Sequence, residues 1–369
     1  MDSSLVSLFL DAVHVEAMSL HERPVVQFIH ERLAGLPIRI IEDATAAIVG
    51  GDAGNLICIP PSFDPSRPSL ALLAHMDTPR STAGVRPVLD ASRIASDGST
   101  VLGVDNRAGL SVLLHALTRN VKEGGGGNFI VVFTIGEELG MYGSKHINLG
   151  PYNVRTCYVF DCSRRPGPFI KSAVGCSLYT VKFIGKSSHA GVAPEKGVSA
   201  IRIAAQALSE FPLGRLSPTM TSNIGMISGG EATNIVPDRC TVDGEVREFD
   251  QRRIDDHIAM LKETCLRVAA KAGGSVEFQS QVDFPPFVLD PACDAFTETV
   301  DMLRSVGLAP NPIEYLGGSD ANMLNAKGIP AVNLGVGAQN PHGNDEFILL
   351  EDLEKTEQIT TALIARSVA

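Results

Sequence analysis

The sequence lacks several features that would assign it to common classes of protein. Basic residues are not in excess: 31 Lys and Arg stand against 42 Asp and Glu, for a formal net charge of -11. Nucleic acids and anionic membranes bind basic patches that replace their counterions, so we expect neither as a partner. No apolar run reaches membrane length, and the first residues carry acids where a secretory signal carries basic residues.

The cysteines also form no recognisable pattern. There are seven, an odd number, and no two are spaced as Cys-x-x-Cys. This favours reduced thiols over a disulfide framework or a structural zinc knuckle. No pairing of cysteine with histidine indicates a cysteine nucleophile. We therefore expect a cytoplasmic protein that acts on small molecules or peptides.

The chain is long enough for roughly two domains, with 369 residues of which 44% are hydrophobic. Amphipathic helices are predicted at residues 3–17, 23–34 and 107–120. Strands with near-continuous apolar runs alternate with helices up to residue 161. This pattern predicts an α/β fold with a mixed, mostly parallel sheet and helices on both faces.

The composition changes after about residue 174. From there to residue 283 the predicted order is strand, helix, strand, strand, helix, strand, which is the order of a ferredoxin-like α+β domain. We therefore expect a catalytic domain made of residues 1–173 and 284–369, with residues 174–283 inserted into it as a lid or dimerisation domain.

Polar side chains lie where several apolar strands end. The run LALLAHMD closes with His75 and Asp77, NFIVVFTIGEELG leads into Glu137 and Glu138, and RTCYVFD stops at Asp161. Because the carboxyl ends of parallel strands meet at one edge of a sheet, we expect these side chains to converge. Two adjacent carboxylates repel each other unless a cation holds them, which indicates a metal site.

Two further candidates complete a set of metal ligands. Asp105 comes just before the helix at 107–120, where it could also be an N-cap, and His342 lies in a Gly-rich loop before the last helix. Zinc binds imidazole and carboxylate, and a pair of zinc ions needs a bridging carboxylate. We therefore predict two zinc ions, for which cobalt or manganese could substitute, bridged by Asp105. The other ligands would be His75 and Asp161 on one ion and Glu138 and His342 on the other.

Asp77 and Glu137 take supporting roles in this site. Asp77 follows His75 by two residues and is suited to accept the second imidazole N–H of His75, which fixes its tautomer. Glu137 stands beside a ligand, where a general base can take a proton from water whose pKa the metal lowers to about 7. Passing that proton to a leaving amine is the chemistry of amide hydrolysis.

These motifs, in this order, resemble a known family across essentially the whole chain. The family is the two-zinc exopeptidases of the aminoacylase, carboxypeptidase and peptidase T group, and the tail is most similar to its peptidase T branch of tripeptide aminopeptidases. The matching segments are His75-Met76-Asp77, the turn from Gly103 to Gly109, Glu137-Glu138, Asp161, Ser188-His189-Ala190-Gly191, and GGSDANML with PHGNDEF.

The resemblance implies roles that the residues alone do not reveal. His189 would stabilise the oxyanion of the transition state, Arg247 would hold a substrate carboxylate, and Asn234 would contact the substrate. Without the resemblance they could be a surface histidine, an exposed strand charge and a turn residue. The family also implies a cis peptide bond between Asp105 and Asn106, and closure or a homodimer through the inserted domain to complete the site.

Two departures from the family leave the ligands intact. Asn106 replaces a second acid found in many members, and Arg107 stands where lysine is common. The implied activity is aminopeptidase action on short peptides, and a deacylase or carboxypeptidase of the same group that acts on N-acyl amino acids is the nearest alternative. A non-catalytic zinc-binding assembly protein is a further alternative, but such a protein has no need of Glu137 beside its metals.

Overall fold

The computed structural model describes residues 3–368, and these form two compact units. The first unit contains the chain up to Lys171, residues 288–314, and the chain from Ser319 onward. The second contains residues 172–287 and 315–318. Within residues 3–368, no helix has both the length and the apolar character needed to cross a membrane.

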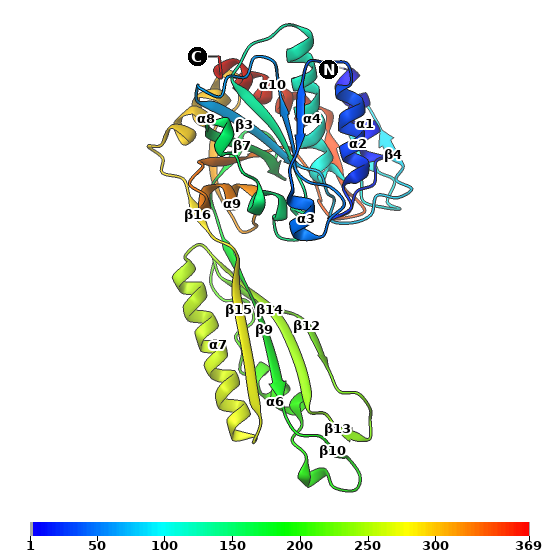
Figure 1. Ribbon diagram of the computed structural model, residues 1–369, viewed down its shortest axis with the longest axis vertical. Helices are drawn as coiled ribbons and strands as arrows, with labels where there is room; N and C mark the ends of the chain where they lie inside the picture. Colours follow the sequence, from blue (N-terminus) through cyan, green and yellow to red (C-terminus); the bar gives the residue numbers. More distant parts are fainter. Residues whose placement is uncertain (1–2, 369) are drawn as a thin grey trace. The chain divides into compact units, whose positions relative to one another are not determined.

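The first unit is built on a large mixed sheet, in which nine strands are described (Figure 1). Its four central strands, in the order β6-β3-β7-β18, are parallel, while β1 and β2 on one side and β8 on the other are antiparallel to their neighbours. The strands are β1 (Arg39–Glu42), β2 (Leu56–Ile59), β3 (Ser69–His75), β6 (Phe129–Thr134), β7 (Val154–Cys162), β8 (Pro168–Ala173), β16 (Phe287–Val288), β17 (Asn311–Tyr315) and β18 (Ala331–Gly335).

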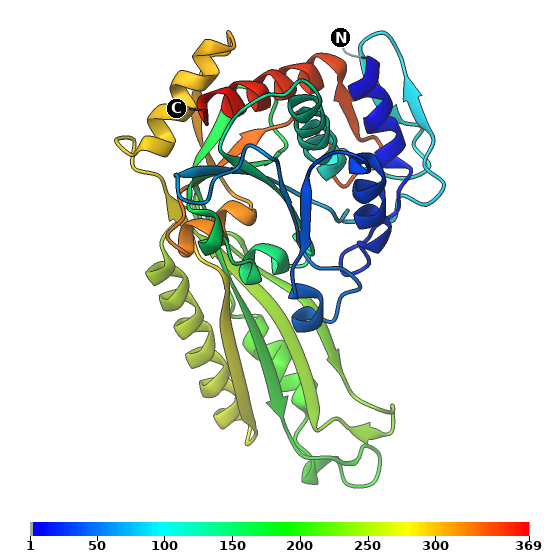
Figure 2. The ribbon, with the colours of Figure 1, turned by 45° about the horizontal axis from the view of Figure 1, so that its top comes forward.

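Helices cover both faces of this sheet (Figure 2). The long helix α4 packs on β3, β6 and β7 and is surrounded by α1, α2 and α10, with α8 next to α10; α9 packs on β7 and β18 with α5 and α3 beyond it. The bounds are α1 (Ser3–Val13), α2 (Arg23–Leu33), α3 (Thr45–Val49), α4 (Val104–Lys122), α5 (Tyr142–His146), α8 (Asp294–Ser305), α9 (Asp320–Ala326), α10 (Leu350–Arg366) and the short 3-10 helix η1 (Gly150–Tyr152).

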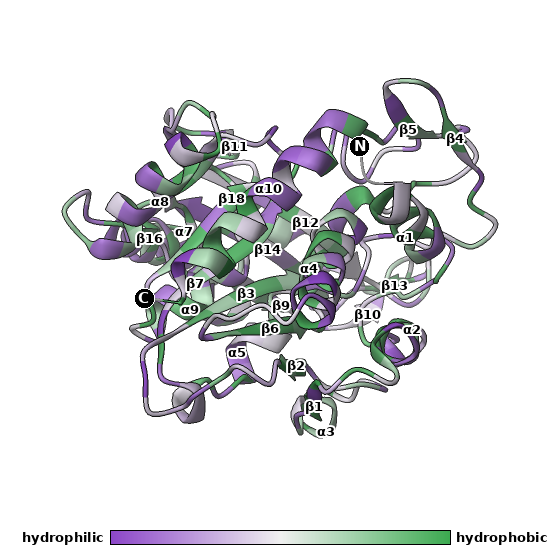
Figure 3. Cartoon of the chain, turned by 90° about the horizontal axis from the view of Figure 1, so that it is seen from above, coloured by the Kyte–Doolittle hydropathy of each residue, from purple (hydrophilic) through white to green (hydrophobic). Residues whose placement is uncertain are grey.

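The central strands are the core of this unit. Every residue of β3 and of β6 is buried, and both strands are coloured as hydrophobic in Figure 3. This agrees with their near-continuous apolar sequence, because a strand covered on both faces has no exposed side. The polar residues of these segments are therefore confined to the strand ends and the loops that follow.

The first helix ends earlier than predicted, at Val13 instead of residue 17. The residues after it run past the end of β3, where the main-chain N–H of Thr78 donates to the carbonyl of Ala17 at 2.9 Å. The buried side chain of Arg107 donates to the carbonyl of Ala12 at 3.1 Å. The bond from Arg107 uses a carbonyl group, that of Ala12, which a helix continuing to residue 17 would have needed. The sequence pattern does not show this long-range contact.

A small antiparallel sheet in this unit was not predicted. Its strands lie in the order β19-β5-β4, and it joins the loop before α4 to the chain before α10. The bounds are β4 (Pro87–Leu89), β5 (Arg93–Ser96) and β19 (Phe347–Leu349).

The second unit is a four-stranded antiparallel sheet in the order β12-β14-β9-β15, with the short β11 on its edge (Figure 1). Helices α6 and α7 pack against it and against each other. The elements follow the ferredoxin-like order expected from the sequence. They are β9 (Gly175–Ile184), β10 (Ser188–His189), η2 (Pro194–Lys196), α6 (Ala200–Leu208), β11 (Gly214–Arg215), β12 (Thr221–Gly229), β13 (Ile235–Val236), β14 (Arg239–Glu248), α7 (Gln251–Lys271) and β15 (Ser275–Phe284).

Candidate metal centre and active site

His75 is the last residue of β3, and its side chain is 1% exposed. Its Nε2 atom lies 3.0 Å from Oδ1 of Asp105 and 3.3 Å from Oδ1 of Asp161. Its Nδ1 atom lies 3.2 Å from Oδ1 of Asp77. The parallel neighbours β6 and β7 end beside β3, which is why residues far apart in the sequence meet around this imidazole.

His342 approaches the same cluster from the loop after β18. Its Nε2 atom lies 3.4 Å from Oδ2 of Asp105 and 3.6 Å from Oε1 of Glu138. Each oxygen of Asp105 therefore faces a different histidine. Single ligand atoms of His75, Asp105 and Glu138 all lie within 4.8 Å of one another. The structure thus brings together all five residues that the sequence suggested as metal ligands.

Burial and mutual repulsion raise the pKa of most acids in this cluster. Burial, and then repulsion from Asp105, raises the pKa of Glu138 to about 8. Burial and the charge of Asp161 raise the pKa of Glu137 well above its ordinary value. Burial also acts to raise the pKa of Asp105, but hydrogen bonds with the two imidazoles outweigh it and hold this pKa below its usual range.

The donor set fits a pair of divalent metal ions. Oε1 of Glu138 is buried and has no hydrogen-bond partner among residues 3–368. A buried carboxylate oxygen without a donor is costly, and a cation is the partner that would satisfy it. Imidazole and carboxylate are ligands that zinc accepts, and Asp105, which is approached from both sides, can bridge two ions.

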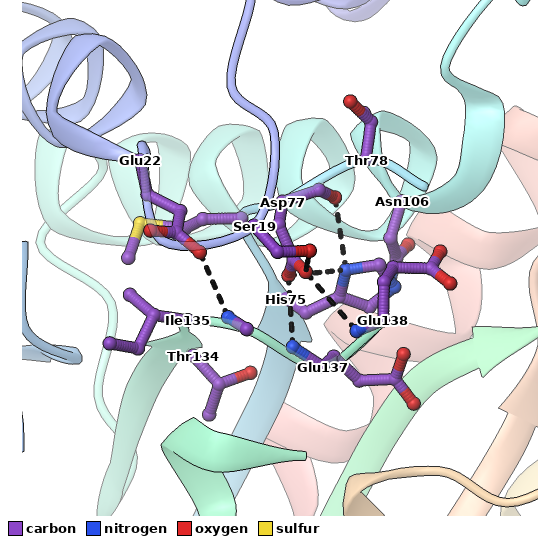
Figure 4. A network of polar contacts seen from close by, with 12 residues as sticks. Ser19, Glu22, His75, Asp77, Thr78, Asn106, Thr134, Ile135, Glu137 and Glu138 are labelled. Atoms are coloured by element: carbon purple, nitrogen blue, oxygen red, sulfur yellow. Dashed lines mark hydrogen bonds and ion pairs between the residues drawn. The ribbon is translucent and has the colours of Figure 1, made fainter. Parts of the chain in front are cut away.

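Asp77 supports more than the imidazole of His75 (Figure 4). The side chain is 0% exposed, and its Oδ1 accepts a hydrogen bond from the main-chain N–H of Glu137 at 3.1 Å. Its Oδ2 accepts from the N–H of Glu138 at 3.1 Å and from the hydroxyl of Ser19 at 2.6 Å. One carboxylate therefore fixes a histidine and the backbone of the Glu137-Glu138 pair, while the Glu137 carboxylate points away from it in Figure 4.

Two buried ionisable side chains, whose roles the sequence did not suggest, support the same region. Glu22 is 0% exposed, and its Oε1 accepts from the main-chain N–H of Gly136 at 2.9 Å. Arg107 is also 0% exposed and donates to the carbonyl of Met76 at 2.6 Å. Burial lowers the pKa of Arg107 to about 10, against the opposing charges of Asp77 and Glu22. In these bonds both side chains contact main-chain groups, so the sequence does not reveal which residues they contact.

The turn that carries Asp105 has the backbone that the resemblance implied. The peptide bond between Asp105 and Asn106 is cis. The Asn106 side chain is buried, donates from Nδ2 to the carbonyl of Phe160 at 2.7 Å and accepts from the N–H of Gly109 at 3.0 Å. Asn106 thus anchors the start of α4 to the end of β7.

His189 and Asn234 lie next to each other in the second unit. Strand β10 pairs with β13 through His189 and Ile235, the residue after Asn234. The exposed imidazole of His189 accepts two hydrogen bonds at Nδ1, from the N–H groups of Gly191 and Val192, both at 3.1 Å. In the neutral ring the proton is therefore on Nε2, which is left as the donor.

Arg247 lies toward the other end of the same sheet. It pairs with Cys176 near the start of β9, whereas His189 follows the end of β9 at Ile184. A ten-residue strand spans roughly 30 Å. Within the second unit of a single chain, Arg247 therefore lies far from His189 and Asn234. The guanidinium of Arg247 is engaged by Glu245 through two hydrogen bonds of 2.9 and 3.0 Å.

Comparisons with known proteins agree with this architecture. Residues 172–272 match the family model of a peptidase dimerisation domain of the M20 type. YqjE of Bacillus subtilis, an uncharacterized protein, is 32% identical over 98% of both chains. The crystal structure of the aminopeptidase PepT from Bacillus cereus is 32% identical, with a TM-score of 0.86, and covers 99% of this chain and 98% of its own.

A tripeptidase structure from Staphylococcus aureus is 31% identical with a TM-score of 0.89, again over 99% of this chain and 98% of that one. The protein therefore belongs to the M20 peptidases, in the group of peptidase T, and is a metal-dependent peptide hydrolase.

Proposed function

We propose that the protein is a two-zinc aminopeptidase that releases the N-terminal residue of short peptides, tripeptides foremost. The observation that carries the proposal is the position of Asp105, whose oxygens face His75 at 3.0 Å and His342 at 3.4 Å. The similarity to an aminopeptidase and to a tripeptidase supports the choice of substrate.

The ligands divide between two ions in this proposal. His75 and Asp161 would hold one zinc ion. Glu138 and His342 would hold the other, and Asp105 would bind both. Zinc at these positions would polarise the carbonyl group of the scissile amide and lower the pKa of water. Cobalt and manganese accept similar ligands and are expected to substitute.

Glu137 acts as the general base. It takes a proton from the attacking water and delivers it to the nitrogen of the leaving amine, so that it ends the cycle ionised as it began. Asp77 accepts the main-chain N–H of Glu137 and keeps the base in place, as well as orienting His75. In this proposal Glu138 binds a metal ion and Glu137 does not, so the carboxylate of Glu137 remains available for proton transfer.

The second unit supplies the remaining groups. His189 donates from Nε2 to the oxyanion that develops on the substrate, and Asn234 contacts the substrate beside it. Arg247 binds the C-terminal carboxylate of the peptide, in competition with Glu245. Since His189 and Arg247 are roughly 30 Å apart along the sheet, closure of the unit or a second copy of the chain must complete the site.

A homodimer through the inserted domain is part of the proposal. The matching family model is a dimerisation domain, and strand β12, next to the short edge strand β11, exposes Met226 by 66% and Ile227 by 60%. A second copy would cover these apolar side chains. The cytoplasm suits the seven free cysteines, six of which are buried, because thiols stay reduced there.

A substrate panel tests the proposed function. The zinc, cobalt or manganese enzyme is incubated with a tripeptide, its N-acetylated form, a dipeptide and N-acetyl amino acids, and the products are identified by mass spectrometry. We expect the free N-terminal residue and a dipeptide from the tripeptide and no cleavage of the acetylated form. Release of the C-terminal residue, or preferential hydrolysis of N-acetyl amino acids, would replace the aminopeptidase assignment by a carboxypeptidase or a deacylase.

A further inference from the structure

Glu346 connects two loops that are far apart in the sequence. It lies four residues after His342, and its side chain is buried, with the whole residue 1% exposed. Oε2 accepts a hydrogen bond from the main-chain N–H of Gly103 at 2.6 Å, and Oε1 accepts from the N–H of Asp105 at 3.1 Å. Both carboxylate oxygens are therefore used on the turn that carries the central carboxylate of the metal cluster.

The turn needs such a partner because it opens helix α4. The first N–H groups of a helix have no acceptor within the helix, and α4 has no side-chain cap from its own N-cap residue, Gly103. Gly103 has a positive φ of 80°, and a side chain there would be strained. Glu346 supplies the missing acceptor from a distance, and its charge is favoured at this end of the helix.

Glu346 is itself fixed at the main chain. Its carbonyl accepts from the N–H of Ser96 in β5 at 2.9 Å, and its N–H donates to the carbonyl of Gly343 at 3.2 Å. The Glu346 carboxylate is thus a buried contact between the loop at residues 342–346, here called the His342 loop, and the turn at residues 103–105, here called the Asp105 turn. The side-chain contacts made close to His342 are exposed: Arg80 donates to the carbonyl of His342 at 3.2 Å and to Oδ1 of Asn344 at 3.0 Å, and Nδ2 of Asn344 donates to the carbonyl of Gly98 at 3.2 Å.

We propose that Glu346 is a positioning residue of the metal centre: it holds the Asp105 turn against the His342 loop and so sets how the bridging carboxylate meets the second histidine. This inference rests on the roles given to Asp105 and His342 in the proposed function. Without Glu346, the exposed contacts of Arg80 keep the His342 loop attached, but the Asp105 turn is no longer held to it. The result is a centre in which the ligands remain present and their mutual placement is lost.

Two variants and a control test this role by zinc titration of the metal-free protein with a competing chelator. Glu346→Gln keeps the shape but turns an amide donor toward a main-chain N–H, and Glu346→Asp keeps the charge one methylene short. Glu351→Gln changes a side chain on α10 that is 69% exposed and pairs with Arg165, so it should behave as the wild type. Circular dichroism and thermal unfolding of the metal-free proteins show which variants are folded.

We expect zinc affinity to fall about 10 to 100-fold in Glu346→Gln and by less in Glu346→Asp, as for other residues that orient ligands. Turnover should fall through kcat, with KM for the tripeptide little changed. Wild-type zinc affinity in either folded Glu346 variant would overturn the proposal. If the wild type binds zinc but cleaves no tripeptide, the proposed function fails while the titration still decides the role of Glu346.

Discussion

The sheets of the two units are buried in different ways. In the first unit, helices lie on both faces, and every residue of β3 and β6 is buried. In the second, the strands alternate: Leu178 and Lys182 in β9 are exposed between buried neighbours. In the first unit, buried apolar strands therefore end directly at a buried polar cluster. In the second unit, the strands expose side chains to solvent along their length.

This contrast determines what holds the functional side chains. A buried polar group must find a partner. In the first unit Asp77, Glu22 and Glu346 each accept main-chain N–H groups from loops that carry a ligand or the base. In the second, the exposed His189 is held by N–H groups of its own turn. The first unit thus presents a preorganised polar cluster, whereas a role of the second unit toward the substrate belongs to the proposed function.

The largest effect is expected when a proposed metal ligand is removed from the first unit. His75→Ala takes away the imidazole that contacts Asp105 and Asp161, and the remaining carboxylates repel each other. We expect the purified variant to lose at least one zinc ion by elemental analysis and to show no measurable release of amino acids from a tripeptide. His30→Ala, on the exposed side of α2, should keep zinc and activity. Full zinc content in His75→Ala would remove it from the ligand set.

A substitution in the second unit should separate turnover from metal binding. His189→Ala removes the proposed oxyanion donor, and we expect kcat to fall about 10² to 10³-fold with unchanged zinc content. Lys186→Ala, at a nearby exposed position, is the control and should match the wild type. If His189→Ala lost zinc, or kept its full kcat, the division of labour between the units would be wrong.

A smaller effect is expected for Asp77, which touches the centre only through other residues. Asp77→Ala leaves His75 and the N–H groups of Glu137 and Glu138 without their acceptor. Zinc affinity and kcat should each fall about 10 to 100-fold. Ser19→Ala, which removes only one donor to Asp77, should cost less. Wild-type zinc affinity and kcat in Asp77→Ala would contradict the acceptor role of Asp77.

The smallest effect concerns pH and stability. Burial, and then the charge of Asp77, raises the pKa of Glu22 to about 7 from 4.5, while Arg107 lies nearby with the opposite charge. Between pH 4.5 and a pH of about 7, Glu22 has lost its proton in the unfolded chain but still holds it in the folded chain. The free energy of unfolding therefore falls as the pH rises through this range. Glu22→Gln should remove about 3 kcal/mol of this fall between pH 4 and pH 8.

Urea unfolding of the metal-free proteins at both pH values measures this difference. Glu263→Gln, on the exposed side of α7 in the second unit, should keep the pH dependence of the wild type. An identical pH dependence in Glu22→Gln would mean that Glu22 is ionised in the fold at pH 5 and is stabilised by contacts other than those described.

That the candidate ligands come together could be predicted from the sequence, because their signal is local. His75, Glu138 and Asp161 each follow an apolar run, and parallel strands bring such ends to one edge. The central strands and the long helices of both units followed from periodicity, which is also a local signal. The cis bond after Asp105 and the candidate role of His189 required the resemblance to a family, since the residues themselves are unremarkable in type and spacing.

The residues that hold the site together could not be predicted in this way. Glu346 reaches N–H groups 241 and 243 residues away, and Glu22 reaches one that is 114 residues away. A main-chain donor is present at every residue except proline, so neither partner leaves a trace in the sequence. The early end of α1 at Val13 has the same origin, because it depends on Arg107, far along the chain.

The most direct test of the account is Glu137→Gln, measured at once for zinc content and for turnover. The substitution keeps the size of the side chain and removes its ability to accept a proton. We predict that the variant binds as much zinc as the wild type and hydrolyses a tripeptide at least about 10² to 10⁴-fold more slowly. Full turnover in a zinc-loaded Glu137→Gln protein would contradict the assignment of the base, and with it the proposed mechanism.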